Sequence, residues 1–92
     1  MNKADLTEKV AEKATVSKKQ ADAVITAAIE TIMEAVANGD KVTLVGFGSF
    51  EPRERKEREG RNPKTGEKMM IPATTVPAFS PGKLFKDKVV SS

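Results

Sequence analysis

Residues 53–75, about a quarter of the chain, hold almost no large apolar side chain before Met69-Met70-Ile71. The stretch is dense in charge and centres on a turn-rich cluster at residues 60–66, which reads GRNPKTG. Two extended legs flank this turn, so we expect a long two-stranded ribbon. A leg of about ten residues reaches roughly 30 Å. The ribbon has no apolar face with which to dock on the rest of the chain, so it should stay mobile until it lies on a partner.

The remaining residues must build the core of a chain of only 92 residues. Domains this small bury little surface and usually need a disulfide, a metal or a partner chain for stability. The sequence has no Cys and no His, which excludes disulfides and the usual zinc sites and leaves a partner chain. Ser-His and Cys-His nucleophiles are excluded for the same reason, so we expect neither an enzyme nor a metal or cofactor site.

Two helices are expected in residues 1–40, where they should form a hairpin. Asn2 can cap the first helix, which carries an apolar residue at every fourth position, at Leu6, Val10 and Ala14. A capping box, Ser17-Lys18-Lys19-Gln20, starts the second helix, and Asn38-Gly39 ends it. The apolar face of the second helix is too broad for this chain to cover alone, and it comprises Ala21, Ile25, Ala28, Ile29, Ile32 and Val36.

Strands and a third helix are expected after residue 40. Residues 41–45 alternate as a strand, with Val42 and Leu44 on one face, and Gly46-Phe47-Gly48 makes a tight turn into a second strand that resumes at Ser49. Pro72 and Pro77 in the return leg must lie at an edge or a bulge. Ser80-Pro81 is expected to start the third helix with a cap and a proline in its first position, and Leu84, Phe85 and Val89 to anchor it.

Two short glycine patterns have alternative interpretations. Residues 60–68 differ from a phosphate-binding loop, because the spacing to Gly66 is one residue too long and Glu67 separates that glycine from Lys68. Gly46-Phe47-Gly48 lacks the third glycine of a dinucleotide fingerprint and joins two strands, so it is a turn. The four Phe residues could stack on bases, but they are the only large aromatic side chains available for a core, which we favour.

The charge is unevenly distributed along the chain. Residues 1–40 carry five basic and seven acidic side chains, a net of −2, whereas residues 41–92 carry eleven basic and six acidic ones, a net of +5. Such asymmetry indicates a polyanionic partner, although a solvated basic surface is an equal alternative on charge alone. Arginine, which binds phosphate bidentately and enters minor grooves, occupies four positions of the ribbon: Arg53, Arg55, Arg58 and Arg61. Interleaved glutamates at 54, 57 and 59 are expected to pair with these arginines and moderate their affinity.

Pro63 lies at the centre of the predicted ribbon tip. From its spacing alone it is a turn residue. A proline is also rigid, apolar and without an N–H to leave unsatisfied, so it could act as a wedge between base pairs.

Four segments together carry a specific pattern: GFGSF at residues 46–50, the basic positions Arg55 and Arg58, the tip GRNPKTG at 60–66 and VPAF at 76–79. This pattern, within a match over essentially the whole chain, resembles the HU family of bacterial histone-like proteins. The resemblance implies an α+β fold in an intertwined dimer. Its parts are a helical base (1–40), a β-sheet saddle (41–52 and 76–80), two extended β-ribbon arms (53–75) and a C-terminal helix (81–92).

The resemblance also implies roles for individual residues. HU proteins are themselves among the architectural proteins described as binding the minor groove with apolar wedges. By this likeness Pro63 intercalates, and Gly46 and Gly48 form the saddle turn. The residues implied to bind DNA are Lys3, Arg53, Arg55, Arg58, Arg61, Asn62, Pro63, Lys64, Lys83 and Lys86. Those implied to form the core and dimer interface are Ile29, Ile32, Leu44, Phe47, Phe50, Phe79 and Phe85. Pro52 at the arm base departs slightly from the family and is expected to stiffen the hinge.

The expected function is therefore that of an architectural protein that bends and compacts double-stranded DNA without reading its sequence, with a preference for bent, nicked or gapped DNA. The alternatives are a site-specific bender of the integration host factor type and a protein-interaction dimer whose arms clasp an acidic partner. A heterodimer with a paralogue and RNA binding remain open. The N-terminus lacks a signal peptide and no apolar stretch has membrane length, so we expect a soluble cytoplasmic protein associated with the nucleoid.

Overall fold

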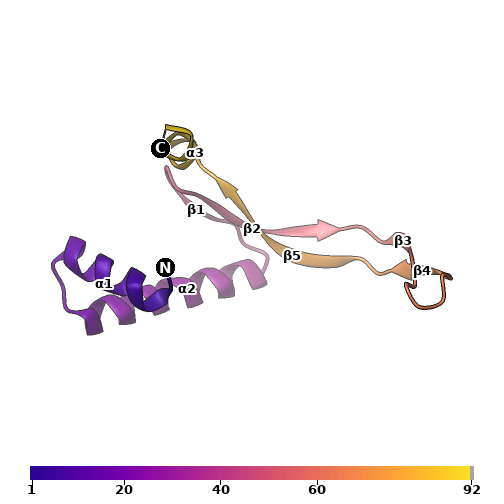
Figure 1. Cartoon of the computed structure of the whole chain (residues 1–92), viewed down its shortest axis with the longest axis horizontal. Helices are drawn as coiled ribbons and strands as arrows, with labels where there is room; N and C mark the ends of the chain where they lie inside the picture. The colour runs from indigo at the N-terminus through magenta and orange to yellow at the C-terminus, as the bar shows by residue number, and fades with distance from the viewer. Residues whose placement is uncertain (92) are drawn as a thin grey trace. The chain divides into compact units, whose positions relative to one another are not determined.

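The computed structural model describes residues 1–91, which form an α+β fold. They divide into two compact units, residues 1–34 and the residues from Ala35 onward. The elements follow the order α1, α2, β1, β2, β3, β4, β5, α3 (Figure 1). Among residues 1–91, no helix combines the length and the apolar character that crossing a membrane requires.

Helix α1 spans Lys3–Ala14 and begins at the predicted cap. The side chain of Asn2 accepts a hydrogen bond from the Asp5 N–H at 2.9 Å, and the Asp5 carboxylate accepts one from the Asn2 N–H at 3.3 Å. This reciprocal pair satisfies two of the N–H groups that a helix leaves unpaired at its start. The helix ends at Thr15, whose left-handed conformation (φ 58°) lets its N–H bond back to the last turn.

Helix α2 spans Lys18–Ala37 and begins at the predicted capping box. Ser17 and Gln20 each accept the other's backbone N–H at 3.1 Å. Past the end of the helix, Gly39 adopts φ 92°, and the Asp40 N–H donates to the Ala35 carbonyl at 2.9 Å. The start and the end predicted for this helix are both confirmed.

Helix α1 and the first turns of α2 lie side by side and are joined by ion pairs (Figure 1). The buried positions of this unit are Thr7, Ala11 and Ala21, whereas Leu6 is 42% exposed. The buried positions of α1 thus lie one residue beyond Leu6 and Val10 of the predicted apolar stripe. The small side chains let the helices approach closely, and the Thr7 hydroxyl can be buried because it donates to the Lys3 carbonyl at 2.8 Å.

The strands form two separate antiparallel ladders. Strands β1 (Val42–Leu44), β2 (Gly48–Arg55) and β5 (Thr74–Pro81) make a three-stranded sheet in the order β1-β2-β5. Strands β3 (Arg58–Arg61) and β4 (Lys68–Ile71) make a two-stranded ladder of their own. The β2–β5 pairing runs unbroken from Gly48 opposite Pro81 to Arg55 opposite Thr74. The sheet thus continues into the base of the arm, and the pairing breaks at residues 56–57, beyond the boundary predicted at 53.

The turn between β1 and β2 is held by its glycines, as predicted. Gly46 adopts φ 85°, and the Phe47 N–H donates to the Leu44 carbonyl at 2.9 Å. A β-carbon on Gly48 would lie 2.6 Å from both the Phe79 ring and the Ser80 carbonyl oxygen. Only glycine therefore fits at this crossing.

Helix α3 spans Lys83–Ser91 and begins two residues later than Ser80-Pro81 predicted. Ser80 and Pro81 instead remain in the ladder, opposite Ser49 and Gly48. Gly82 acts as the cap, because its carbonyl accepts the Lys86 N–H at 3.0 Å while its own N–H donates to the Phe47 carbonyl at 2.8 Å. The pairing of β5 with β2 as far as Pro81 therefore outweighs the local tendency of Ser-Pro to start a helix.

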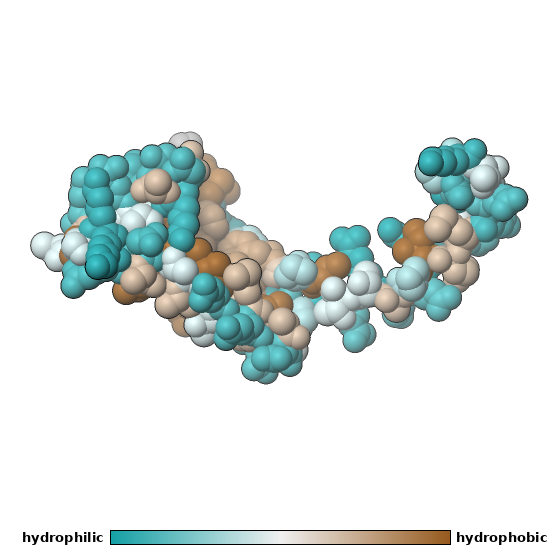
Figure 2. Space-filling view, turned by 90° about the horizontal axis from the view of Figure 1, so that it is seen from below, coloured by the Kyte–Doolittle hydropathy of each residue, from teal (hydrophilic) through white to brown (hydrophobic). Residues whose placement is uncertain are grey.

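The four phenylalanines gather in one cluster, as predicted for a core. Phe47 lies 5.3 Å from both Phe79 and Phe85 between ring centroids, and Phe50 lies 4.9 Å from Phe79. The cluster is only partly covered, since Phe47 is 45% exposed. Of the two other expected anchors of α3, Leu84 is 70% exposed and Val89 63%. Figure 2 shows such uncovered apolar surface in brown, next to hydrophilic surface in teal.

Candidate nucleic-acid interface

The three-stranded sheet has one apolar and one polar face. Neighbouring residues of a strand point to opposite faces, and residues directly opposite in a ladder share a face. The registers place Phe50 and Phe79 on one face with Val42 and Leu44, which confirms the predicted alternation. The other face, which we call the polar face, carries small or charged side chains and one valine: Thr43, Ser49, Ser80, Glu51, Ala78, Arg53, Val76, Arg55 and Thr74.

The small hydroxyl side chains of the polar face were not among the predicted site residues. Thr43 Oγ1 and Ser49 Oγ lie 3.3 Å apart, and Ser80 is opposite Ser49 on the other side of β2. Hydroxyl groups of this kind commonly bind phosphate oxygens. Counting alternate residues outward from Phe50 would have identified them, because the core phenylalanine defines which face is polar.

The polar face also holds a group of three charges. Arg53 Nη2 donates to Glu51 Oε1 at 3.1 Å, and Lys41 Nζ lies 3.9 Å from Glu51 Oε2. The side chains of Lys41 and Arg53 are 58% and 57% exposed, whereas that of Glu51 is 27% exposed. Sequence reasoning assigned Arg53 to DNA binding but gave no role to Lys41 or Glu51.

The β3–β4 ladder divides its side chains differently. Arg58, Gly60, Met69 and Ile71 share one face, and Glu59, Arg61, Lys68 and Met70 share the other. Ile71 leans over Gly60, where a β-carbon would lie 2.8 Å from its Cδ1 atom. Arg58 and Arg61 thus project from opposite faces and are both exposed. Figure 2 shows the far end of the ribbon as mostly hydrophilic, with a small apolar patch on one side.

The predicted pairing of Glu54, Glu57 and Glu59 with the ribbon arginines is wrong, since within residues 1–91 none of these glutamates contacts an arginine in an ion pair. Arg53 pairs with Glu51 at its own strand, and Glu59 pairs with Lys68 across the ladder at 3.5 Å. Within residues 1–91, Glu54 and Glu57 form no ion pair. Arg55, Arg58 and Arg61 therefore keep their guanidinium groups available to an external anion.

The tip of the arm is a closed turn that presents Pro63 to solvent. Asn62 closes it: its N–H donates to the Glu67 carbonyl at 2.9 Å, and its carbonyl accepts the Gly66 N–H at 2.8 Å. The side-chain Oδ1 of Asn62 also accepts the Lys64 N–H at 2.9 Å, which makes an Asx turn. Gly66 supplies the required left-handed conformation (φ 74°). Asn62 thus holds the turn, and Pro63 is exposed at its start.

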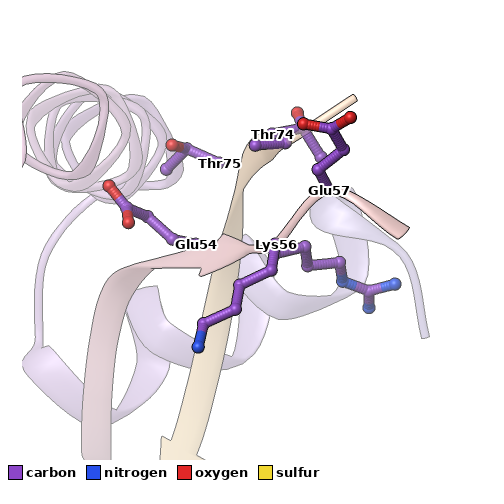
Figure 3. Close-up of a pocket in the computed structure, with 7 residues that line it drawn as sticks. Glu54, Lys56, Glu57, Thr74 and Thr75 are labelled. Carbon is purple, nitrogen blue, oxygen red and sulfur yellow. The ribbon is translucent and has the colours of Figure 1, made fainter. Parts of the chain in front are cut away.

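A shallow hollow of about 310 Å³ marks the break between the two ladders. It is lined by Glu54, Arg55, Lys56, Glu57, Ala73, Thr74 and Thr75. In Figure 3 the carboxylates of Glu54 and Glu57 lie near the two threonines, while Lys56 extends away from them. Its lining is exposed and mixed in charge, so it lacks the enclosed apolar walls of a small-molecule site. Residues 1–91 also contain no cluster of acidic side chains that could hold a metal ion.

The predicted lysines outside the arm lie in different settings. Lys3 belongs to the helical unit, where its Nζ lies 2.6 Å from Thr26 Oγ1 and 3.6 Å from Asp22 Oδ1. Lys83 is the first residue of α3 and is exposed. Lys86 lies one turn later and borders an apolar groove that is also lined by Phe79, Pro81, Phe85, Val89 and Val90.

Known proteins resemble this chain over nearly all of its length. Residues 1–90 match the family described as "Bacterial DNA-binding protein". A DNA-binding protein HU of a Nostoc species is 78% identical over 89 residues, which cover 97% of this chain and 95% of that protein. A Synechocystis HU is 68% identical over 95 residues, again covering 97% and 95%.

Solved structures agree with these sequence relatives. An Anabaena HU–DNA cocrystal structure superposes with a TM-score of 0.94 at 75% identity and covers 100% of both chains. HU from Thermotoga maritima superposes with a TM-score of 0.69 at 39% identity, covering 97% of this chain and 98% of that one. The matched family consists of DNA-binding proteins and is not a family of enzymes. With its glycine turn, its arm-tip pattern and a family match across residues 1–90, the chain belongs to the bacterial DNA-binding protein family.

Proposed function

We propose that this protein is an architectural DNA-binding protein that bends double-stranded DNA largely without reading its sequence. The observation that carries the proposal is the arm: a two-stranded ribbon with exposed arginines on both faces, which ends in a closed turn with Pro63 exposed. A relative that is 75% identical was crystallised with DNA, which supports the same partner for this chain. In a bacterial cell such a protein associates with the nucleoid.

Binding rests on contacts to the phosphate backbone. The arginines of the arm and the hydroxyls of the polar face are donors suited to phosphate oxygens. Contacts to phosphates carry no sequence information, so affinity should depend on charge and on shape. Lys83 and Lys86 on α3, together with Lys3, are proposed to bind the flanking phosphates of bent DNA. Lys3 must first leave Asp22 and Thr26 to do so.

Bending rests on Pro63, which we propose acts as a wedge at one base step. Unstacking a step costs a few kcal/mol, which additional contacts along the bent duplex offset. A turn closed by the backbone of Asn62 and by Gly66 keeps the proline in position while it enters the groove. Two chains provide two arms and therefore two kinks. The energetic argument favours DNA that is already bent, nicked or gapped, because its deformation costs less.

A gel-shift series on linear, nicked and pre-bent duplexes across a range of salt concentrations tests this function. We expect the tightest binding on nicked and bent DNA and a steep loss of affinity with salt. Equal affinity for all three forms would contradict the bending mechanism. A strong preference for one selected sequence over random duplexes would indicate the integration host factor type of activity. The absence of any shift at low salt would favour an acidic protein partner instead.

Binding through the phosphates of the DNA backbone leads to a separate prediction for the arm arginines. Arg58→Ala and Arg61→Ala should each weaken binding alike on every duplex sequence and flatten the slope of log K against log salt by about 1. Because the two side chains lie on opposite faces of β3, the double variant should show nearly additive losses. A loss confined to some sequences would show that these arginines read bases.

A further inference from the structure

We propose that Lys41 and Arg53 form a binding site for one phosphodiester group of the DNA backbone, and that the Glu51 carboxylate occupies this site until DNA displaces it. The inference rests on the proposed DNA binding. It adds two residues, Lys41 and Glu51, to the interface and gives Glu51 the role of an internal competitor for phosphate.

The geometry of Glu51 is that of a bound anion between two cations. Its Oε1 accepts a hydrogen bond from Arg53 at 3.1 Å, and its Oε2 lies 3.9 Å from the Lys41 ammonium. A phosphodiester likewise presents two unesterified oxygens, each of which can take one cation. The two cations come from different segments, since Arg53 is on β2 and Lys41 directly precedes β1.

The site lies on the polar face of the sheet, whose hydroxyl groups the proposed function assigns to DNA phosphates. Glu51 and Arg53 share the polar face with Ser49 and Ala78, which are too small to cover them. Both cations are more than half exposed, whereas Glu51 is the least exposed side chain in any ion pair of residues 1–91. An incoming phosphate can therefore reach Lys41 and Arg53 from solvent more easily than it can reach the less exposed carboxylate of Glu51.

The exchange of carboxylate for phosphate should be easy. Ion pairs exposed to water to this degree contribute little to stability, so breaking them has a small cost. The carboxylate nevertheless neutralises part of the charge of the two cations before binding. The affinity for DNA and its dependence on salt should therefore both be smaller than the number of basic residues suggests.

Glu51→Gln tests the proposal, because it keeps the size and one hydrogen-bond acceptor of the side chain but removes its charge. Binding to a linear duplex at about 0.1 M salt should tighten about two- to fivefold, and the slope of log K against log salt should steepen by up to about 0.9. Glu54→Gln is the matched control. Glu54 is on the same strand but the opposite face, is exposed and forms no ion pair within residues 1–91, so we expect a change below about twofold.

Two further variants isolate the site. In an Arg53→Gln background, Glu51→Gln should lose most of its gain in affinity, and Lys41→Gln should weaken binding and flatten the salt slope. Equal effects of Glu51→Gln and Glu54→Gln would overturn the proposal, since they would reflect only net charge. Weaker binding by Glu51→Gln with an unchanged melting temperature would overturn it as well, because the carboxylate would then be positioning the cations. Failure of the unaltered protein to bind DNA would overturn the proposed function itself.

Discussion

The two prolines at the base of the arm show how single residues keep it two-stranded. Pro52 and Pro77 are directly opposite each other in the β2–β5 ladder. A proline has no N–H to donate, so two opposed prolines fit only at a pair of positions that exchange no hydrogen bond within the ladder. Their ring nitrogens then face outward, where a third strand would require donors. The base of the arm is thereby protected from edge-to-edge pairing with another chain, and β5 is the edge strand that Pro77 was predicted to need.

Pro63→Ala should reduce DNA bending more than DNA affinity. The substitution removes the rigid apolar ring, while the turn remains closed by the backbone bonds of Asn62 with Glu67 and Gly66. The phosphate contacts are thus kept and the wedge is lost. Ring-closure rates of short duplexes measure bending, and titrations of the same duplexes measure affinity. Ring closure at the unaltered rate would rule out the wedge.

Two glycine substitutions should separate the stability of the sheet from that of the arm tip. Gly48→Ala places a methyl group 2.6 Å from the Phe79 ring and the Ser80 carbonyl oxygen, and should cost about 1–3 kcal/mol of unfolding free energy. At Gly66 a β-carbon meets nothing within 4 Å, so Gly66→Ala carries only the strain of its left-handed backbone, about 1 kcal/mol, in a local turn. Thermal unfolding followed by circular dichroism should show a clear decrease in Tm for Gly48→Ala and little change for Gly66→Ala. A similar decrease for both would show that the tip contributes to global stability.

At the scale of elements, the arm is two ladders joined by two short unpaired segments, one on each leg. Strands β3 and β4 pair only with each other, and the β2–β5 ladder ends at Arg55 and Thr74. A lone two-stranded ladder is marginally stable in water, whereas β2 and β5 also support the phenylalanine cluster. The break at residues 56–57 and 72–73 is therefore the natural place for the distal ladder to bend relative to the sheet.

Hydrogen exchange should reveal this difference between the ladders. The amides of β3 and β4 should exchange rapidly in the free protein and become protected when DNA is bound, because the ribbon then lies against a partner. The amides of Glu51 and Ala78, which lie directly opposite each other in the β2–β5 ladder at a hydrogen-bonded pair of positions, serve as the internal control and should exchange slowly in both states. Slow exchange of β3 and β4 without DNA would contradict a mobile arm.

At the scale of the whole molecule, one chain does not bury a complete core. The only buried apolar residues among residues 1–91 are Ala11 and Ala21, and no large side chain is fully buried. Ile29, Leu44 and Phe47, all predicted for the core and dimer interface, are each more than 40% exposed. Ile32 and Phe50 are intermediate in burial, and Phe79 and Phe85 are more than a third exposed. Soluble proteins rarely expose so much apolar surface unless a partner covers it.

We therefore expect an obligate dimer whose stability depends on protein concentration. Sedimentation equilibrium should give twice the mass of the chain, and Tm should rise as the concentration is raised. Ile29→Glu, at an exposed position on α2, should lower both the dimer fraction and Tm, whereas Thr31→Glu on the same helix is a suitable comparison for the added charge. A folded monomer that unfolds at the same temperature at all concentrations would refute the expectation.

The caps, turns and ribbon followed from the sequence because local rules govern them. Asn2, Ser17 and Gln20 bond to groups three residues away, and Gly39, Gly46 and Gly66 stand where the backbone requires φ above zero. The absence of apolar residues in most of residues 53–75 excluded them from any core. The phenylalanine cluster was also predictable, since the chain has no other large aromatic side chain to bury.

Only the tertiary structure decided which distant residues share a face and where pairing stops. The ladder register places Ser80 beside Ser49 and holds Pro81 in a strand, against the local preference of Ser-Pro for a helix start. The pairing of β1 with β2 likewise brings Lys41, Glu51 and Arg53 together, although Lys41 and Glu51 are ten positions apart in the sequence. Side-chain spacing within one segment defines the faces of that segment. The alignment of two segments depends on the sum of their pairing and packing energies, which no local pattern contains.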